Sequence, residues 1–234
     1  MRLSWKSVYF VLAGLSLLYA IWYLDQRLSG VLATPEVIAE SVNGTEAPRQ
    51  AAKDHELAAV IVQRHDEIFN DPDSPVGANP KGSTNLAEFF DYNCTYCRQA
   101  AQMLAGLERD DRDLRVVFKQ NPVFGPDSVF AARAALASQK QGKFLALHEA
   151  LMAHPGPVTK TSTLEIAVQL GLDLERLKKD MEDTAVDEEI KRTRALARDL
   201  HLFSVPSFVV GNEIVQGARN ADEMKRLIKS PQGL

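Results

Sequence analysis

Hydrophobic residues follow two different spacings in the middle of the chain, which predicts a mixed α/β domain. Residues 85–90 (NLAEFF) and 114–119 (LRVVFK) are short apolar runs typical of β-strands. Between them, residues 94–107 place apolar side chains at helical spacing. A strand, a helix and a second strand in so short a segment predict a βαβ unit with two parallel strands.

A long helical pattern follows this unit. Residues 127–200 show helical periodicity almost throughout. We expect breaks at Gly142, at residues 154–157 (HPGP) and at Gly171, because glycine and proline interrupt helices. The segment therefore predicts several helices inserted after the second strand.

Strand character returns near the C-terminus. Residues 206–210 and 213–216 flank the turn dipeptide Gly211-Asn212, which predicts a β-hairpin. Residues 221–228 then have the pattern of a final helix.

These elements predict one α/β domain over residues 81–234, with a helical insertion at about residues 124–200. Upstream, residues 54–69 have the pattern of a moderately amphipathic helix, and the loop at 71–83 is rich in proline, glycine and asparagine. We assign residues 34–80 to a linker and this N-terminal helix.

The N-terminus carries an export signal. Residues 8–24 are apolar and uncharged and follow Arg2 and Lys6, and their length is near the lower limit of a spanning helix, roughly 17 to 25 residues. We expect residues 1–33 to be an N-terminal transmembrane helix that sends the rest of the chain across the membrane. The alternative is a signal peptide cleaved after Ala33, which would leave a soluble exported protein.

Composition narrows the function. The net charge is −4 and basic residues gather in no stretch, so we expect no nucleic-acid partner. Only two cysteines occur, three positions apart. A disulfide closing a loop of about four residues would add only about 2 kcal/mol of stability, against about 3 for a loop of about fifteen. The pair is therefore a weak structural staple.

Cys94 and Cys97 lie at the predicted strand-to-helix turn, and their position predicts different roles. At a helix N-terminus, unpaired N–H groups and the helix dipole lower the pKa of a thiol. Asn93 is the expected N-cap of this helix. Cys97 is expected to lie deeper, one turn on. We therefore expect Cys94 to be the nucleophile and Cys97 the residue that resolves a mixed disulfide.

A second interpretation of the same cysteines is a copper or zinc binding protein. A closed metal site needs about four ligands. The others would have to come from His148, His154 or His201, or from a second chain. His148 on an apolar face and His201 beside Leu202 are more typical of packing or surface residues. An exported CxxC lies where disulfides persist, which favours redox chemistry without a metal or other cofactor.

Three stretches of the chain resemble a known family. They are EFFDYNCTYC at residues 88–97, VVFK at 116–119 and SVPSFVVG at 204–211, and residues 125–137 add to them. They are similar to the DsbA family of bacterial thiol–disulfide oxidoreductases, in the branch of ScsC-like and Com1-like proteins. The resemblance extends from about residue 68 to the C-terminus. It implies a thioredoxin fold and a protein thiol–disulfide oxidoreductase.

The resemblance also implies site residues. Val205 and Pro206 would form a cis peptide bond facing the cysteines, and a bend there presents backbone groups to an extended peptide. Thr95 and Tyr96, between the cysteines, would complete the substrate-binding surface.

Glu88 matches a buried acid that the family carries six residues before its first cysteine. By the strand period of two it shares a face with Leu86 and Phe90. A buried carboxyl group near Cys97 would have a raised pKa and could exchange a proton with that thiol. Lys119 on the next strand is the expected ion-pair partner of Glu88.

The sequence departs from the family's best-known oxidase between the two cysteines, and this difference affects whether the protein oxidises or reduces its substrates. Thr95-Tyr96 replaces the Pro-His pair of that protein, so the Cys94 thiolate should be less stabilised and the disulfide less oxidising. The sequence leaves oxidase and isomerase or reductase open.

The expected partners are exported protein substrates and a membrane redox protein, either DsbB-like or ScsB/DsbD-like. Homo-oligomers through residues 54–69 are a further possibility that the branch implies, although that segment lacks a sustained heptad repeat.

Overall fold

The computed structural model describes residues 15–26, 51–53 and 55–229, and the chain divides into two compact units, Met1–His55 and Glu56–Leu234. In the first unit, residues 15–26 form a helix with exposed side chains. Within the described residues, no helix is both long and apolar enough to cross a membrane. Most of the predicted anchor over residues 1–33, and its alternative cleavage site at Ala33, lie outside the described residues.

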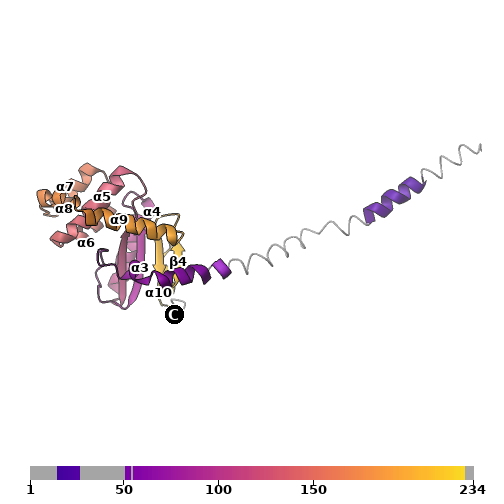
Figure 1. Cartoon of the computed structure of the whole chain (residues 1–234), viewed down its shortest axis with the longest axis horizontal. Coiled ribbons are helices and arrows are strands. Elements are labelled where there is room, and N and C mark those ends of the chain that lie inside the picture. The colour runs from indigo at the N-terminus through magenta and orange to yellow at the C-terminus, as the bar shows by residue number, and fades with distance from the viewer. Residues whose placement is uncertain (1–14, 27–50, 54, 230–234) are drawn as a thin grey trace, which may run out of the picture. The chain divides into compact units, whose positions relative to one another are not determined.

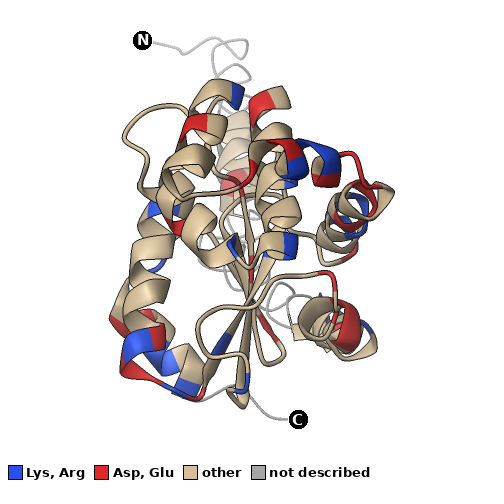
Figure 2. Cartoon of the chain, turned by 90° about the vertical axis from the view of Figure 1, so that its left-hand side faces the viewer, with Lys and Arg blue, Asp and Glu red and all other residues tan. Residues whose placement is uncertain are grey.

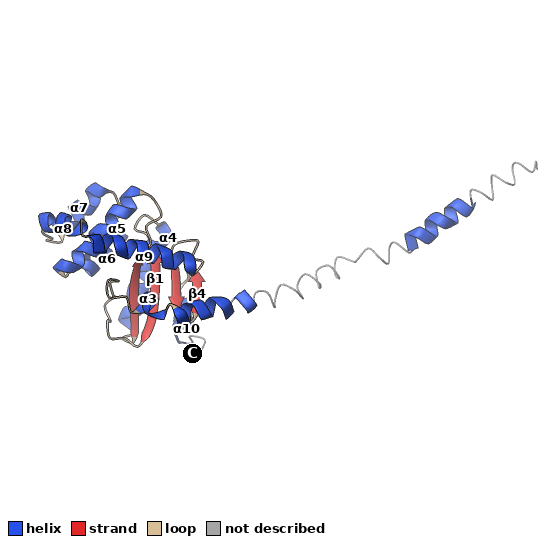
Figure 3. Ribbon diagram, viewed as in Figure 1, coloured by secondary structure: helices blue, strands red, loops and turns tan. Residues whose placement is uncertain are grey.

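A four-stranded sheet forms the centre of the second unit (Figure 3). The strands are β1 (Thr84–Phe90), β2 (Leu114–Gln120), β3 (Ser207–Val210) and β4 (Glu213–Gln216), in the order β2-β1-β3-β4. β1 pairs with β2 in parallel, whereas β3 is antiparallel to both β1 and β4. The predicted βαβ unit and the predicted hairpin are both confirmed.

Helices account for most of the remaining chain (Figure 1). The helix α4 (Thr95–Asp110) connects β1 to β2, and α10 (Ala221–Lys229) follows the hairpin. Residues 55–63 and α3 (His65–Phe69) are two consecutive helices where the pattern predicts one. The insertion contains α5 (Pro126–Ser138), a 3-10 turn (Gln139–Gln141), α6 (Phe144–Ala153), α7 (Lys160–Gln169), α8 (Leu174–Met181) and α9 (Thr184–Asp199).

The predicted breaks in the insertion are confirmed. Gly142 and Gly171 follow helical segments with φ angles of 65° and 73°. This left-handed conformation ends a helix and is easily adopted only by glycine. Both signs of charge are interspersed over the domain (Figure 2), and in the insertion Lys140 lies close to Asp180 and Asp183.

The sheet separates two hydrophobic clusters. On one face, residues such as Leu86, Phe118 and Phe208 pack with apolar side chains of α4, α5, α6 and α10. On the other, Phe89 and Val117 pack with the helix at 55–63, α3 and α9. The alternation of side chains along each strand therefore decides which cluster a residue joins. Residues on the α4 face lie beneath the predicted cysteine site.

The loop before β1 continues the sheet at the β2 side. Val76 makes an antiparallel bridge with Val117, Phe118 N donates to Pro75 O at 2.9 Å and Gly77 N donates to Val116 O at 2.8 Å. This segment covers the outer edge of β2, next to the βαβ unit that contains the cysteines.

Gly82, at the end of this loop, lies close to the backbone of Asp113, the residue before β2. A Cβ atom at this position would lie 2.5 Å from the backbone oxygen of Asp113, which cannot move without disturbing β2. We expect Gly82→Ala to lower the free energy of unfolding by about 1–3 kcal/mol in urea denaturation. The control is Gly106→Ala in α4, where the nearest atom is 3.8 Å away. That variant should be neutral or more stable by up to about 1 kcal/mol. Equal effects of the two substitutions would contradict the packing argument.

Candidate active site

Cys94 lies at the turn between β1 and α4, where it is the N-cap residue of the helix. Its Sγ atom accepts a hydrogen bond from the backbone N–H of Cys97 at 3.3 Å. The expectation that Asn93 caps α4 is wrong. The Asn93 amide instead accepts from Val158 N at 2.8 Å and donates to Val158 O at 2.9 Å, so it connects the turn to the helical insertion. The sulfur atom therefore takes the place of the usual oxygen at the helix N-terminus.

Hydrogen bonding makes Cys94 acidic. Its pKa is lowered from 9.0 to about 6, above all by the hydrogen bond from the Cys97 side chain and then by the backbone N–H groups of Cys97 and Tyr96. Partial burial and the charge of Asp91 oppose this effect. At pH 7, Cys94 is therefore mostly a thiolate, which is the reactive form of cysteine.

Cys97 has the opposite character. Its side chain is fully buried, whereas Cys94 keeps 4% of its surface exposed. Burial raises the pKa of Cys97, and the hydrogen bond to Cys94 and the charge of Glu88 raise it further. Both cysteines are free thiols in the structure. The pair therefore consists of a thiolate at the helix N-terminus and a fully buried thiol that donates a hydrogen bond to it.

The chain segment before β3 faces Cys94. The Val205–Pro206 peptide bond is cis, as predicted. The Cys94 sulfur lies 3.3 Å from the backbone oxygen of Val205, and it can donate a hydrogen bond to that oxygen when it is protonated. Residues more than a hundred positions apart are thus brought together at the Cys94 sulfur.

Glu88 lies beneath this pair. Its side chain is fully buried and belongs to the α4 face of β1, as the strand period predicts. Neither carboxyl oxygen has a hydrogen-bond partner within the described chain. Burial raises the pKa of Glu88 from 4.5 to about 8, and the charges of Cys94 and Glu108 add to this. The group is therefore mainly a neutral acid at pH 7.

The expected ion pair between Glu88 and Lys119 is absent. In the sheet register Glu88 lies opposite Phe118, and Lys119 lies opposite Phe89. Successive side chains point to opposite faces, so Lys119 emerges on the far side of the sheet. There its Nζ donates to Ser74 Oγ at 2.7 Å and lies 3.6 Å from an oxygen of Asp71.

Exposed apolar residues occur on the segments around Cys94. Tyr96 is 62% exposed and Thr95 is also exposed, whereas Phe203, shortly before the cis bond, is 83% exposed. Val123 and Phe124, in the loop after β2, are 53% and 58% exposed. Large apolar side chains in water near a reactive group are typical of a surface that binds another molecule.

Asp91, Asn93 and Ser128 are site residues that the sequence interpretation missed or misassigned. The Asp91 carboxylate accepts hydrogen bonds from Asn93 N at 2.7 Å and Ser128 Oγ at 2.8 Å. It also accepts from Val123 N at 2.7 Å and Phe124 N at 2.9 Å. The only sequence signal was an aspartate directly after an apolar strand, which is common at turns.

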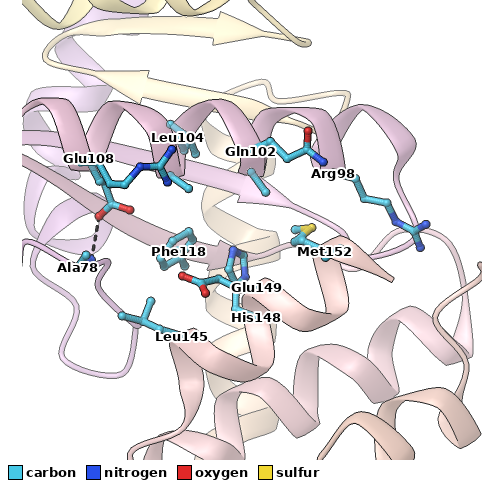
Figure 4. A pocket seen from close by; sticks show the side chains of 14 residues that line it. Ala78, Arg98, Gln102, Leu104, Glu108, Phe118, Leu145, His148, Glu149 and Met152 are labelled. Atoms are coloured by element: carbon cyan, nitrogen blue, oxygen red, sulfur yellow. Dashed lines mark hydrogen bonds between the residues drawn. The ribbon is translucent and has the colours of Figure 1, made fainter. Parts of the chain in front are cut away.

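His148 packs inside the domain, as predicted. Burial lowers its pKa to about 3, and its Nδ1 atom lies 3.2 Å from Tyr92 Oη. It also lines a pocket of about 280 Å³ between α4 and α6, whose other lining residues include Arg98, Glu108 and Met152 (Figure 4). Neither cysteine lines this pocket. Over the described ranges, no three His, Cys, Asp or Glu side chains are grouped in a way that could hold a metal ion.

The acidity of Cys94 can be measured directly. We expect the thiolate absorbance near 240 nm of the reduced protein to titrate with a midpoint near pH 6, because hydrogen bonds stabilise that thiolate. Cys94→Ala should remove this transition, whereas Cys97→Ala should raise its midpoint by removing the strongest donor. A midpoint near the ordinary value of about 8.5 in the unmodified protein would contradict the assigned geometry.

Glu88 makes stability depend on pH. Its pKa is 4.5 in the unfolded chain and about 8 in the folded chain, so folding favours the protonated form. The contribution is fully present below pH 4.5 and is lost as pH rises toward 8. We expect Glu88→Gln to remove this loss and to raise the free energy of unfolding by a few kcal/mol more at pH 8 than at pH 4.5.

Urea titrations at the two pH values measure the Glu88 effect, and Glu149→Gln at an exposed position is the control. The control should change stability by at most about 0.5 kcal/mol at either pH. Parallel pH profiles for Glu88→Gln and the unmodified protein would show that Glu88 ionises as freely as an exposed acid.

A protein family and several solved structures are similar to this chain. The family described as "DSBA-like thioredoxin domain" matches residues 85–229. A thioredoxin-like oxidoreductase from Silicibacter pomeroyi is 42% identical, with 71% of this chain and 96% of that chain covered and a TM-score of 0.70. The catalytic domain of Proteus mirabilis ScsC is 26% identical, with 74% and 97% covered and a TM-score of 0.68.

Two further matches are a periplasmic protein and a much longer antiporter. A periplasmic thioredoxin-like protein from Salmonella enterica serovar Typhimurium is 32% identical, with 71% and 94% covered and a TM-score of 0.64. The Na⁺/H⁺ antiporter NhaA 1 of Salinispora arenicola is 28% identical over 163 residues, which are 68% of this chain and 25% of the antiporter. The chain thus spans about a quarter of the length of the curated relatives it matches.

Proposed function

We propose that this chain, which belongs to the family of DSBA-like thioredoxin domains, is a protein thiol–disulfide oxidoreductase with Cys94 and Cys97 as its redox pair. The observation that carries the assignment is their difference in acidity, with the pKa of Cys94 lowered to about 6 and that of Cys97 raised. A thiolate that exchanges with substrates and a thiol that stays protonated until needed are the two parts that the reaction requires.

In the oxidising direction, a substrate thiolate attacks Cys94 Sγ of the Cys94–Cys97 disulfide. A sulfur–sulfur bond forms between substrate and Cys94, and Cys97 leaves as a thiolate that takes up a proton. A second substrate thiolate then attacks the substrate sulfur of the mixed disulfide. The substrate leaves oxidised, and Cys94 leaves as a thiolate stabilised by the N–H groups of Cys97 and Tyr96. The reducing direction is the same sequence in reverse.

Glu88 is proposed to exchange the proton of Cys97. Both side chains are fully buried on the same side of the sheet, and water cannot readily deliver a proton there. Glu88 is a neutral acid near pH 7 because burial raises its pKa to about 8. A carboxyl group with a pKa near the working pH is suited to both donating and accepting a proton.

Polypeptides are the proposed substrates. The backbone at Val205, before Pro206 and β3, lies next to Cys94 and offers backbone groups to an extended chain. Thr95 and Tyr96 flank the sulfur on the α4 side. The exposed apolar surface of Tyr96, Val123, Phe124 and Phe203 suits the apolar side chains of an unfolded protein.

We infer the direction of the reaction from the acidity of Cys94. A pKa of about 6 lies nearer to that of thioredoxin, about 7, than to that of DsbA, about 3.5. A less stabilised thiolate means a less oxidising disulfide. This supports an isomerase or reductase, which needs a ScsB/DsbD-like membrane partner to keep Cys94 reduced, over a strong oxidase with a DsbB-like partner.

The periplasm is the proposed compartment. The apolar run at residues 8–24, preceded by Arg2 and Lys6, supports export with an N-terminal anchor, and the similar Salmonella protein is described as periplasmic. Self-association through residues 54–69 remains a prediction.

Trapping of a mixed disulfide tests the assignment of the redox pair. We expect reduced Cys97→Ala to accumulate a mixed disulfide between Cys94 and a substrate that contains a disulfide, such as insulin, because the Cys94 thiolate breaks the substrate disulfide and no Cys97 thiol is present to displace the substrate. Cys94→Ala should form no adduct, and both variants should lose insulin reduction down to the uncatalysed rate. Mass spectrometry identifies the adduct.

The same variants separate redox catalysis from metal binding. Tight copper or zinc binding by the reduced, unmodified protein without insulin reduction would overturn the proposal. An adduct on Cys97 in Cys94→Ala would reverse the assigned roles.

A further inference from the structure

Asp91 is a buried acid at the active-site turn whose role the exchange reaction leaves unexplained. Its side chain is 2% exposed, and its two oxygens accept four hydrogen bonds. Oδ1 accepts from Asn93 N and Ser128 Oγ, and Oδ2 accepts from the backbone N–H groups of Val123 and Phe124. Three separate segments therefore meet at one carboxylate: the turn before Cys94, the loop after β2 and the start of α5.

The loop held by Oδ2 presents two apolar side chains to solvent. Val123 and Phe124 are more than half exposed, although the backbone between them is fixed by Asp91. A hydrogen bond to a charged acceptor contributes about 1.5–3 kcal/mol, and the loop would lose two of them without the carboxylate, so we expect it to move. Asp91 therefore determines where the apolar side chains lie relative to Cys94.

The charge of Asp91 also acts on the nucleophile. Among the described residues Asp91 has no basic ion-pair partner, so N–H and O–H dipoles alone stabilise its charge. The Asp91 carboxylate lies beside the peptide that leads into Cys94, because it accepts a hydrogen bond from Asn93 N. The backbone oxygen of Asp91 also accepts a hydrogen bond from Cys94 N at 3.1 Å. A buried negative charge disfavours a second one nearby. In agreement, Asp91 raises the pKa of Cys94 against the groups that lower it.

We propose that Asp91 is a positioning residue with two effects on the exchange reaction: it holds the Val123–Phe124 loop beside Cys94 for polypeptide binding, and its charge limits thiolate formation at Cys94. The first effect selects extended protein substrates over small thiols. The second keeps the disulfide less oxidising. The inference rests on the proposed function of Cys94 as the nucleophile.

The variant Asp91→Asn tests both effects. The amide is neutral and can satisfy only one of the two donor pairs. We expect the acid dissociation constant of Cys94, measured by absorbance near 240 nm, to rise at least about threefold. In glutathione redox buffers, we expect the equilibrium constant for reduction of its disulfide to rise in the same proportion.

A comparison of substrates tests the loop. We expect kcat/KM for insulin reduction by Asp91→Asn to fall at least about fivefold, mainly through KM, because a hydrogen-bonded loop is released. Reduction of its disulfide by dithiothreitol, which has no apolar side chains to bind, should not slow. Equal losses with insulin and dithiothreitol would overturn the selection of polypeptides.

Two controls separate charge from hydrogen bonding. Asp127→Asn removes the same charge from an exposed neighbour that, among the described residues, bonds only Lys160 N, at 3.2 Å. Ser128→Ala removes one hydrogen bond to Asp91 and keeps its charge. Both should leave the Cys94 midpoint unchanged. A Cys94 midpoint that Asp91→Asn leaves unchanged or raises would overturn the effect of charge.

If Asp91→Asn does not fold by circular dichroism, Asp91→Ser provides the same tests, because its hydroxyl is neutral and can accept from Asn93 N. Failure of the proposed function would look different. Insulin reduction would then be absent from the unmodified protein, although its Cys94 midpoint would still respond to Asp91→Asn.

Discussion

The two sulfurs of the pair differ in burial and in hydrogen bonding, and the proposed chemistry depends on this difference. Cys94 and Cys97 lie one helical turn apart, but the first sits at the helix N-terminus and the second is buried beneath it. Charge is stabilised on Cys94 by N–H groups and is excluded from Cys97 by the apolar surroundings. β1, α4 and the segment at Val205 each hold one side of this arrangement. Any change that let solvent reach Cys97 would bring the pKa values of the two thiols closer together. The proposed division of roles, with Cys94 as nucleophile and Cys97 as resolving residue, would then be lost.

The helical insertion is part of the site rather than an addition beside it. The Asn93 amide binds both backbone groups of Val158, which precedes α7, and Asp91 binds Ser128 at the start of α5. The Arg98 guanidinium donates to Tyr92 O and also to His154 O and Gly156 O, beyond the end of α6. These polar contacts fix the active-site turn from the insertion side. The geometry of Cys94 thus depends on residues of the insertion that have no chemistry of their own.

The periodicity of the sequence predicted the secondary structure, which local sequence determines. It could not predict hydrogen bonds and ion pairs between residues that are distant in the chain. The strands, α4, the hairpin and the breaks at Gly142 and Gly171 could all be predicted, because apolar spacing and turn residues are local signals. The face of Glu88 followed from the same alternation.

Asn93 and Lys119 were misassigned for a different reason. Asn93 is a good capping residue, but Val158, 65 positions away, takes its amide. Lys119 was paired with Glu88 by proximity along neighbouring strands, whereas the register places them on opposite faces. The four bonds of Asp91 likewise join segments up to 37 positions apart, and no pattern in the sequence reveals them.

The segment at Val76 limits how the sheet meets other chains. By bridging to Val117 it occupies hydrogen-bonding positions along the β2 edge that an incoming strand would need. The hairpin strand β4 is at the opposite edge of the sheet and is only four residues long. A long unpaired edge is the usual starting point for aggregation by strand addition. If unfolded polypeptides are the substrates, as proposed, one covered sheet edge and one short edge leave little room for strand addition by the substrate.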